Sequence, residues 1–298
     1  MKMKKLLMSL TLAGAAVALL AGCGNGGSND GASGNPVNLL AAGSTALQPL
    51  VDQVAEEFSA QNSHITIQVS GGGSGQGLSG VVQKSIQIGN SDLFAEEKNI
   101  QDENLVGHTV AVVGVAPVVN KDAGVTNLTK QQLIDIFTGK ITNWKEVNGA
   151  DKEIQVINRA EGSGTRFNFE KWALGGETPI KGAGEQDSSG TVQQIVSQTP
   201  GAISYLSFNY FSDNLVALSI DGVEPKAENV VTNKWTIWSY EHMYTNKQND
   251  GEINDAADKF INFILSDEIQ NGLVKQLGFI PVSSMQVERD AQGNVTNK

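Results

Sequence analysis

The sequence predicts a mixed α/β fold in which strands and helices alternate along most of the chain. Three observations support this prediction. Segments such as residues 65–69 alternate apolar and polar side chains, which is typical of half-buried strands. Segments such as residues 47–58 repeat apolar side chains at helical spacing. Turns rich in glycine, serine and threonine separate these segments, and the chain of 298 residues contains 33 glycines. Its length suits one large or two medium domains.

The elements expected in the first half follow from these patterns in order. An apolar run at residues 37–42 predicts the first strand, and the next helix carries Leu47, Val51, Val54 and Phe58 on one face. Thr129 and Gln132 have the spacing of a capping box, so a helix is expected to begin there and to end at Gly139. The remaining expectations are strands at 65–69, 86–92 and 108–119, a helix at 78–85, and a packing role for Trp144.

The second half repeats the alternation. Residues 154–157 predict a strand and residues 167–172 a helix, with a glycine-rich turn between them. Residues 177–190 are polar and glycine-rich, which predicts a loop. The other expected elements are a helix from 191, strands at 201–206, 216–220 and 235–244, a helix at 255–265, a last helix capped by Ser266, and a closing segment at 279–282.

The N-terminus has the pattern of an export signal. Three lysines precede an apolar run, and Leu-Ala-Gly then leads into Cys23, as in a bacterial lipobox. We therefore expect a signal peptide at residues 1–22, a lipid on Cys23, and a flexible tether at residues 23–36, which are rich in glycine, serine and asparagine. A plain signal peptide with an incidental cysteine is the alternative.

Composition excludes several classes of function. Removing the three lysines of the signal takes the net charge from −11 to −14, which disfavours nucleic acid as a partner. Cys23 is the only cysteine, so neither an intrachain disulfide nor a cysteine metal cluster is expected. His64, His108 and His242 lack metal-binding spacing, and no metal or cofactor is expected.

The turn at residues 158–166 is the strongest candidate for a binding site. It links a predicted strand to a predicted helix, whose first backbone N–H groups lack partners inside the helix and lie at its positive end. Ser163 and Thr165 add hydroxyl donors, and Arg159 and Arg166 add guanidinium groups suited to phosphate or carboxylate. The alternative is an ordinary serine N-cap with solvated arginines.

Two further turns have the same character, and a carboxylate lies close to them in sequence. Residues 43–45 and 70–77 each follow a strand and precede a helix. Asp92 follows the strand at 86–92, where it either caps the next helix or accepts a hydrogen bond from a protonated ligand. Monohydrogen phosphate has such a proton and sulfate at neutral pH has none, so an aspartate here predicts discrimination between the two anions.

Catalytic patterns are missing from these turns. Neither Ser163 nor Ser74 stands in a Gly-x-Ser-x-Gly elbow, and the three histidines lie outside the turns in sequence. We therefore expect a binding protein and not an enzyme. A surface phosphatase-like hydrolase that uses Ser163 remains an alternative, because the fold alone decides whether a histidine reaches that serine. A surface adhesin or sensor is a third alternative.

Several motifs together resemble the PstS family, the phosphate-binding proteins of bacterial high-affinity phosphate ABC transporters. The resemblance runs from Cys23 to residues 279–282, and its two specific blocks are residues 137–144 and 159–165. It implies a two-lobed periplasmic-binding-protein-like fold of type II, with two crossover strands joining the lobes and the ligand in the cleft. Lobe 1 would comprise residues 37–115 and 240–298, and lobe 2 residues 116–239.

The resemblance also implies a set of ligand-binding residues and a function. Arg159 would pair with phosphate and would be oriented by Glu161. Asp92 would accept a hydrogen bond from the ligand proton, and Arg166 is an additional candidate for contact with the ligand. The other expected ligand-binding residues are Ser44, Thr45, Ala46, Ser74, Ser163, Gly164 and Thr165.

The implied protein is a lipid-anchored, extracytoplasmic, monomeric receptor that delivers phosphate to membrane permease subunits. A receptor for sulfate or molybdate is the alternative within this class.

Overall fold

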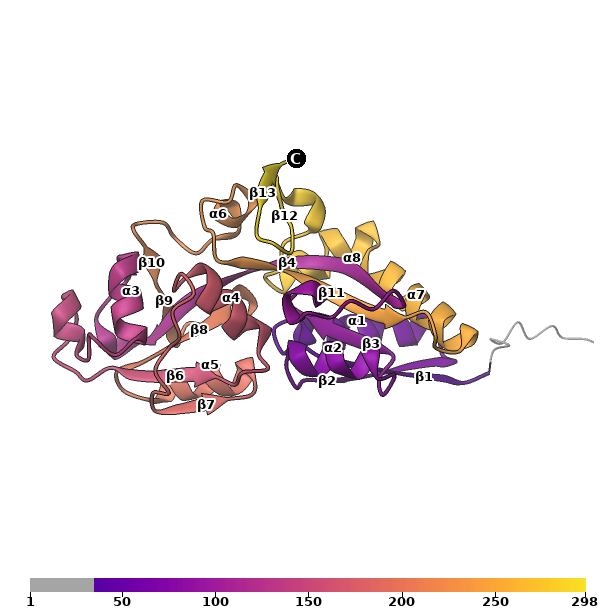
Figure 1. Cartoon of the computed structure of the whole chain (residues 1–298), viewed down its shortest axis with the longest axis horizontal. Helices are drawn as coiled ribbons and strands as arrows, with labels where there is room; N and C mark the ends of the chain where they lie inside the picture. The colour runs from indigo at the N-terminus through magenta and orange to yellow at the C-terminus, as the bar shows by residue number, and fades with distance from the viewer. Residues whose placement is uncertain (1–34) are drawn as a thin grey trace, which may run out of the picture. The chain divides into compact units, whose positions relative to one another are not determined.

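The computed structural model describes residues 35–298, in which strands and helices alternate as predicted (Figure 1). The predicted signal peptide, the lipidation site Cys23 and most of the predicted tether lie outside these residues.

The main sheet of the described part has nine strands in the order β2-β1-β3-β11-β4-β8-β6-β7, and β9 pairs separately with β4. Strands β1 to β3 are mutually parallel, as are β6 to β8, whereas β11 runs antiparallel to β3 and β4. The strands are β1 (Val37–Gly43), β2 (Ile65–Ser70), β3 (Ile88–Ser91), β4 (Leu105–Asn120), β6 (Gln155–Arg159), β7 (Gly184–Gln186), β8 (Ala202–Ser207), β9 (Leu215–Ala217) and β11 (Trp238–Asn246).

Strand β4 belongs to both halves of this sheet. Its residues up to Gly114 pair with β11, and from Val115 onward it pairs with β8 and then β9. Figure 1 shows β4 and β11 side by side between the two groups of strands. These two strands are therefore the covalent and hydrogen-bonded link between the groups.

Helices fill the connections between strands, and two small strand pairs complete the described part. The helices are α1 (Gln48–Gln61), α2 (Ser74–Val82), α3 (Lys130–Phe137), α4 (Gly164–Trp172), α5 (Ser189–Gln198), α6 (Ala227–Val231), α7 (Gly251–Ile264), α8 (Asp267–Asn271) and α9 (Leu273–Gln276). Short 3-10 turns are η1 (Ala95–Lys98), η2 (Lys121–Ala123), η3 (Trp144–Val147), η4 (Phe208–Tyr210) and η5 (Val282–Ser284). The small pairs join β5 (Asn127–Leu128) with β10 (Ser219–Ile220) and β12 (Val287–Arg289) with β13 (Val295–Asn297).

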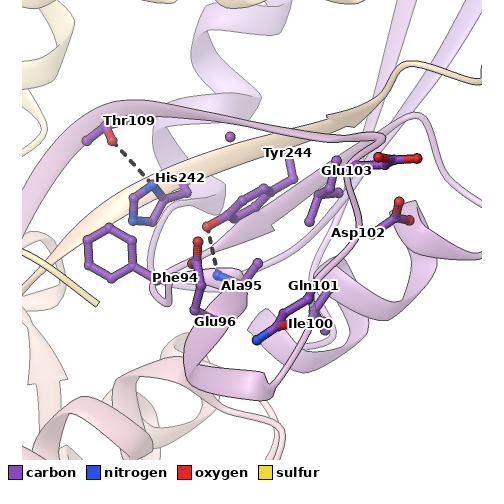
Figure 2. A pocket seen from close by; sticks show the side chains of 12 residues that line it. Phe94, Ala95, Glu96, Ile100, Gln101, Asp102, Glu103, Thr109, His242 and Tyr244 are labelled. Atoms are coloured by element: carbon purple, nitrogen blue, oxygen red, sulfur yellow. Dashed lines mark hydrogen bonds between the residues drawn. The ribbon is translucent and has the colours of Figure 1, made fainter. Parts of the chain in front are cut away.

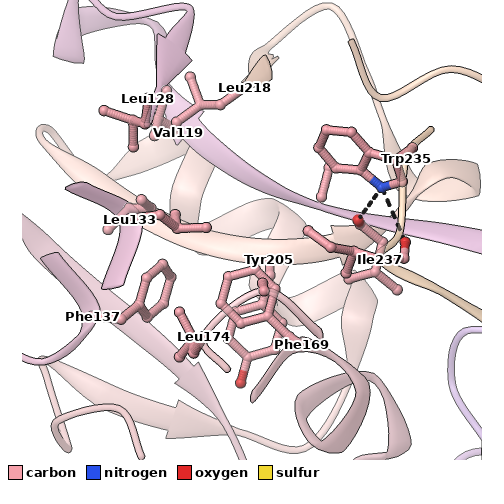
Figure 3. Close-up of a cluster of buried hydrophobic side chains, with 14 of the residues drawn as sticks. Val119, Leu128, Leu133, Phe137, Phe169, Leu174, Tyr205, Leu218, Trp235 and Ile237 are labelled. Carbon is pink, nitrogen blue, oxygen red and sulfur yellow. Dashed lines mark hydrogen bonds between the residues drawn. The ribbon is translucent and has the colours of Figure 1, made fainter. Parts of the chain in front are cut away.

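Separate hydrophobic clusters anchor the elements on the two sides of this link. On one side, α1 and α7 pack against β1 through side chains such as Leu50 and Phe260. On the other side, Phe169 of α4 stacks on Tyr205 of β8, with 4.1 Å between ring centres, and Phe137 meets both rings (Figure 3). Trp144 is fully buried and donates its indole N–H to the carbonyl of Gly201, which confirms the predicted packing role.

Several predicted boundaries were wrong, and glycine explains the most instructive of them. Helix α2 begins at Ser74 and not at residue 78, so it includes Gly75 and Gly77. A β-carbon on Gly77 would lie 2.4 Å from the carbonyl oxygen of Asn90. The glycine therefore lets α2 approach β3 closely, and this packing outweighs its poor helix propensity.

Other boundaries differ because caps and short strands lack periodicity. Helix α7 begins at Gly251, four residues before the predicted start, because the side chain of Asp250 accepts the Glu252 N–H as an N-cap. The predicted strand at 216–220 is split into β9 and β10, which have different partners. Strand β11 begins at Trp238, three residues late. The pair β12–β13 was not predicted.

Candidate functional site

The predicted binding residues converge on one buried region at the ends of strands and the beginnings of helices. Residues 44–46 link β1 to α1, Ser74 begins α2, Asp92 follows β3, and Arg159 ends β6 directly before the turn into α4. These elements come from both sides of the β4–β11 link. The residues buried there are Ser44, Thr45, Ala46, Ser74, Asp92, Arg159, Ser163, Gly164 and Thr165.

Arg159 is the centre of one set of contacts across this region. Its side chain is 1% exposed. Nη2 donates to Thr45 Oγ1 (3.1 Å) and Nη1 donates to Ser189 Oγ (3.0 Å). The carbonyl oxygens of Gln186 and Asp187 accept from Nε (3.1 Å) and Nη2 (3.0 Å). The guanidinium is thus fixed in direction by backbone carbonyls, and its outer edge reaches Thr45 on the opposite side.

Asp92 is the centre of a second set. Thr165 donates its hydroxyl to Asp92 Oδ2 (2.9 Å), and Asn168 donates its amide to the Asp92 carbonyl (3.0 Å). The Asp92 backbone N–H donates to Ser74 Oγ (3.0 Å). The start of α4 therefore faces Asp92 and the start of α2.

The backbones of the two sides also approach closely. The N–H of Gly75 in α2 donates to the carbonyl of Gly162 (3.1 Å), just before α4. A β-carbon on Gly164 would lie 2.3 Å from Ser74 Oγ. The N-terminal ends of α2 and α4 thus meet, and their positive dipole ends favour an anion.

The charge of Arg159 is set by burial and by its neighbours. Burial lowers the pKa of the guanidinium, whereas the negative charge of Asp92 acts in the opposite direction. A guanidinium remains protonated at physiological pH even when buried. The region therefore brings together the Arg159 guanidinium, the Asp92 carboxylate, several hydroxyls and the positive ends of helices.

Glu161 makes no hydrogen bond to Arg159 among residues 35–298, so its expected orienting role stays a prediction. Glu161 is exposed on the turn before α4, and Arg159 is instead oriented by the carbonyls of Gln186 and Asp187. The side chain direction in a turn depends on its backbone conformation, which the sequence alone does not reveal.

The Arg166 guanidinium is used in contacts that brace the turn. Its Nε donates to Glu170 (2.6 Å), and its Nη1 donates to Glu185 (2.8 Å) and to the Arg159 carbonyl (2.7 Å). Ser163 is the N-cap of α4 and accepts the Arg166 N–H (3.2 Å). The structure thus contains the serine N-cap of the alternative interpretation. That interpretation also expected solvated arginines, however, and Arg159 is buried.

Two contacts modify the predicted set of donors. In the turn before α1, Ser44 Oγ accepts the N–H groups of Ala46 and Leu47, both at 3.1 Å, so the Ala46 amide is already paired. Ser189, which sequence analysis missed, is fully buried and contacts both Thr45 and Arg159. It begins α5 after β7, so it repeats the strand–serine–glycine–helix pattern inside a stretch that was predicted as a loop.

A separate cavity of about 640 Å³ lies next to η1 and the β4–β11 pair (Figure 2). Tyr244 accepts the Ala95 N–H there (3.0 Å), and Thr109 contacts His242 Nδ1 (3.3 Å). None of the predicted ligand residues lines it, and its rim carries Glu96, Asp102 and Glu103. Its charge therefore makes it less suited to an anion than the region around Arg159.

Residues 35–298 show neither a group of metal-binding side chains nor a helix that is long and apolar enough to cross a membrane. Within the same residues, the hydroxyl oxygens of Ser163 and Ser74 accept backbone amides, and no hydrogen bond joins either serine to a histidine. The arrangement around Ser163 is thus that of a helix cap.

Comparisons with known proteins agree on the family and the fold. A model of the PBP superfamily domain matches residues 30–268. The phosphate-binding protein PstS of Bacillus subtilis (strain 168) is 48% identical over 98% of this chain and 99% of its own length. A crystal structure of a putative phosphate ABC transporter substrate-binding protein from Clostridium perfringens, with bound phosphate, has a TM-score of 0.75 and 33% identity over 82% of this chain and 99% of that one.

A second solved structure extends the comparison. The ABC-type phosphate transport receptor from Vibrio cholerae has a TM-score of 0.65 and 28% identity, and the match covers 81% of this chain and 99% of that one. The mixed α/β periplasmic-binding-protein fold expected from the sequence is thus confirmed.

Proposed function

Because the chain belongs to the family of PstS phosphate-binding proteins, we propose that it binds inorganic phosphate outside the cytoplasm and delivers it to an ABC permease for import. One structural observation supports this most strongly. A buried, carbonyl-oriented guanidinium, that of Arg159, and a buried carboxylate, that of Asp92, lie in one region with the N-terminus of α4. This combination suits an anion that also carries a proton.

The proposed ligand residues come from both sides of the β4–β11 link. Arg159, Thr165 and the first N–H groups of α4 would donate from one side, and Thr45 and Ser74 from the other. In the described structure these groups bond to one another, with Arg159 on Thr45 and Thr165 on Asp92. Phosphate would take their place between the two sides. The full proposed set is Ser44, Thr45, Ala46, Ser74, Asp92, Arg159, Ser163, Gly164 and Thr165, together with Ser189.

Asp92 would decide which anion is held. Its side chain is 4% exposed, so an unprotonated ligand would place two acceptors together with little water to separate them. An acceptor left unpaired in such a site costs about 1–3 kcal/mol, and more when it is charged. Monohydrogen and dihydrogen phosphate avoid this cost by donating a proton, whereas sulfate does not.

Entry of the ligand requires the two sides to separate, and β4 and β11 are the proposed hinge. We propose lobes at residues 37–115 with 240–298 and at residues 116–239. The change of pairing partner between Gly114 and Val115 supports this boundary. Closure of two lobes about such strands is a known form of hinge motion.

Attachment to the membrane through a lipid on Cys23 is a further proposal, supported by the sequence pattern alone. Metabolic labelling with a radioactive fatty acid tests it, since the Cys23→Ala variant should lose the label and appear in the medium.

Titration calorimetry on protein stripped of anion tests the proposed binding. Phosphate at neutral pH should bind with a Kd of about 1 μM or tighter, roughly −8 kcal/mol, and sulfate and molybdate should bind far more weakly. Absence of phosphate binding would refute the proposal, and tighter sulfate binding would favour the other receptor class. Hydrolysis of a chromogenic phosphate ester that disappears in Ser163→Ala would favour the hydrolase.

A further inference from the structure

Glu241 is a fully buried acid in the middle of β11, and sequence analysis gave it no role. Its exposed fraction is 0%, and among residues 35–298 no side chain or backbone N–H donates to either of its oxygens. A carboxylate buried in this way is strongly disfavoured as an ion. Glu241 must therefore hold a proton, contact a group that stabilises its charge, or both.

Asp92 is the group that faces Glu241. Strand β11 pairs with β3 in an antiparallel register that places His242 opposite Ser91, the last residue of β3, and Glu241 and Asp92 are the next residues along the two chains. The two carboxyl groups are within hydrogen-bonding reach. Within the described part, Asp92 Oδ1 also has no donor, whereas Oδ2 accepts the Thr165 hydroxyl.

A single proton satisfies both groups. If Glu241 is protonated, its O–H donates to Asp92 Oδ1, and both unpaired carboxyl groups then share one hydrogen bond. Burial is the largest cause that raises the pKa of Glu241 well above its usual range, and the charge of Asp92 raises it further. Two close acids that share one proton carry one negative charge instead of two. The smaller negative charge repels an incoming anion less.

The other groups around the pair do not replace this proton. Across β4, Glu241 lies opposite Ala111, which has no charge. Tyr210 of η4 lies near the pair, and burial is the main cause that raises the pKa of its phenol to about 12, but its hydroxyl donates to the Thr45 carbonyl (2.6 Å). Arg159 interacts with the charge of Asp92, but its N–H groups are used elsewhere, as described above.

We propose that Glu241 is a positioning residue of the anion site, which donates its carboxylic acid proton to Asp92 Oδ1 and so keeps Oδ2 as the acceptor that faces the ligand. This inference rests on the proposed phosphate-binding function. In it, Glu241 contributes to selectivity without touching the ligand. It holds the orientation of Asp92, and it keeps Asp92 itself unprotonated, as discrimination against sulfate requires.

Two substitutions separate this role from a merely structural one. Glu241→Gln keeps the shape and an N–H donor for Asp92, whereas Glu241→Met keeps the approximate volume and removes the donor. Thr245→Val, at another buried position of β11, controls for a disturbed strand. Thermal unfolding establishes that each variant is folded.

Phosphate and sulfate affinities across alkaline pH are the first measurement. We expect Glu241→Gln and Thr245→Val to bind phosphate within about threefold of the wild type. Glu241→Met should lose about 10- to 100-fold, the value of one hydrogen bond to a charged group, and should discriminate less against sulfate because Asp92 Oδ2 is then no longer held toward the ligand. The wild type should also lose affinity as Glu241 ionises at high pH, whereas Glu241→Gln should not. Wild-type affinity, selectivity and pH profile in Glu241→Met would overturn the inference.

Infrared difference spectroscopy on the free protein is the second measurement and does not depend on ligand binding. The wild type should show the carbonyl stretch of a neutral carboxylic acid at neutral pH, and Glu241→Gln should lose it. Absence of that band from the wild type would overturn the inference. If the wild type shows the band but binds no phosphate, the proposed function fails while the protonated pair stands.

Discussion

Replacement of Gly164 by alanine should prevent the two sides of the site from closing while leaving each side folded. Gly164 is the first residue of α4 and has no positive φ, so its backbone accepts a β-carbon. That atom would lie 2.3 Å from Ser74 Oγ and 2.9 Å from Asp92 Cβ, whereas ordinary contact begins at 3.4 Å. The start of α4 must therefore retreat from Ser74 by about 1.1 Å, the difference between 3.4 and 2.3 Å.

The expected loss of phosphate affinity depends on which groups must move to admit the new β-carbon. Ser74 Oγ accepts the Asp92 N–H (3.0 Å), so it cannot turn aside without breaking that hydrogen bond. Overpacking of this kind costs about 1–3 kcal/mol, which corresponds to a phosphate affinity lower by about 5- to 150-fold. The cost arises only in the closed state, and alanine is at least as good as glycine in a helix. The thermal unfolding temperature should therefore not fall.

Titration calorimetry and thermal unfolding of Gly164→Ala test this expectation, with Gly190→Ala as the matched control. Gly190 lies in the first turn of α5 and is exposed, and its β-carbon would come no closer than 3.9 Å to Tyr210. The control should bind phosphate like the wild type. Wild-type affinity in Gly164→Ala would refute the closed arrangement of α2 and α4 as the binding state.

Three further predictions concern Asp92, His242 and Arg289. Asp92→Asn should weaken phosphate by about 10- to 100-fold, the value of a charged hydrogen bond, and strengthen sulfate; unchanged selectivity in competition titrations would contradict the role of Asp92. Burial lowers the pKa of His242 to about 3, below about 6.5 in the unfolded chain. The unfolded state therefore binds the proton first, and stability should fall as pH drops below about 6.5, by about 2 kcal/mol at pH 5; urea unfolding should show a weaker decline in His242→Gln. The Arg289 guanidinium stacks between Trp172 and Trp238, at 4.0 and 3.8 Å from the ring centres, so Arg289→Lys should lower the unfolding free energy by about 2 kcal/mol; an unchanged urea midpoint would count against this stack.

The positions of the binding turns could be predicted because two simple patterns define them. A strand with period two, a helix with period 3.6 and a glycine–serine turn between them place residues 43–45 and 158–166 at the end of a strand and the start of a helix. Arg159 and Asp92 were then recognised by their chemistry. Their convergence in one buried region depends on the sheet order, which the sequence pattern alone does not specify.

The residues whose positions or contacts differ from the expectation depend on tertiary contacts. Ser189 lies after β7, a strand of three residues that is too short to show alternation. Glu161 has a suitable charge beside Arg159 in sequence, but its side chain is turned to solvent. Glu241 lies in an aromatic strand, and its position near Asp92 becomes visible only once β3 and β11 are paired. In each case, the surroundings of the residue become clear only when the three-dimensional structure is known.

A crystal structure of the protein with phosphate tests the central claim most directly. One phosphate should lie between the two sides of the β4–β11 link, with Arg159 and the first N–H groups of α4 on one side and Asp92 Oδ2 accepting a hydrogen bond from the ligand on the other. A phosphate bound elsewhere, for example at Arg166 or in the cavity beside His242, with Arg159 still bonded to Thr45, would contradict the claim.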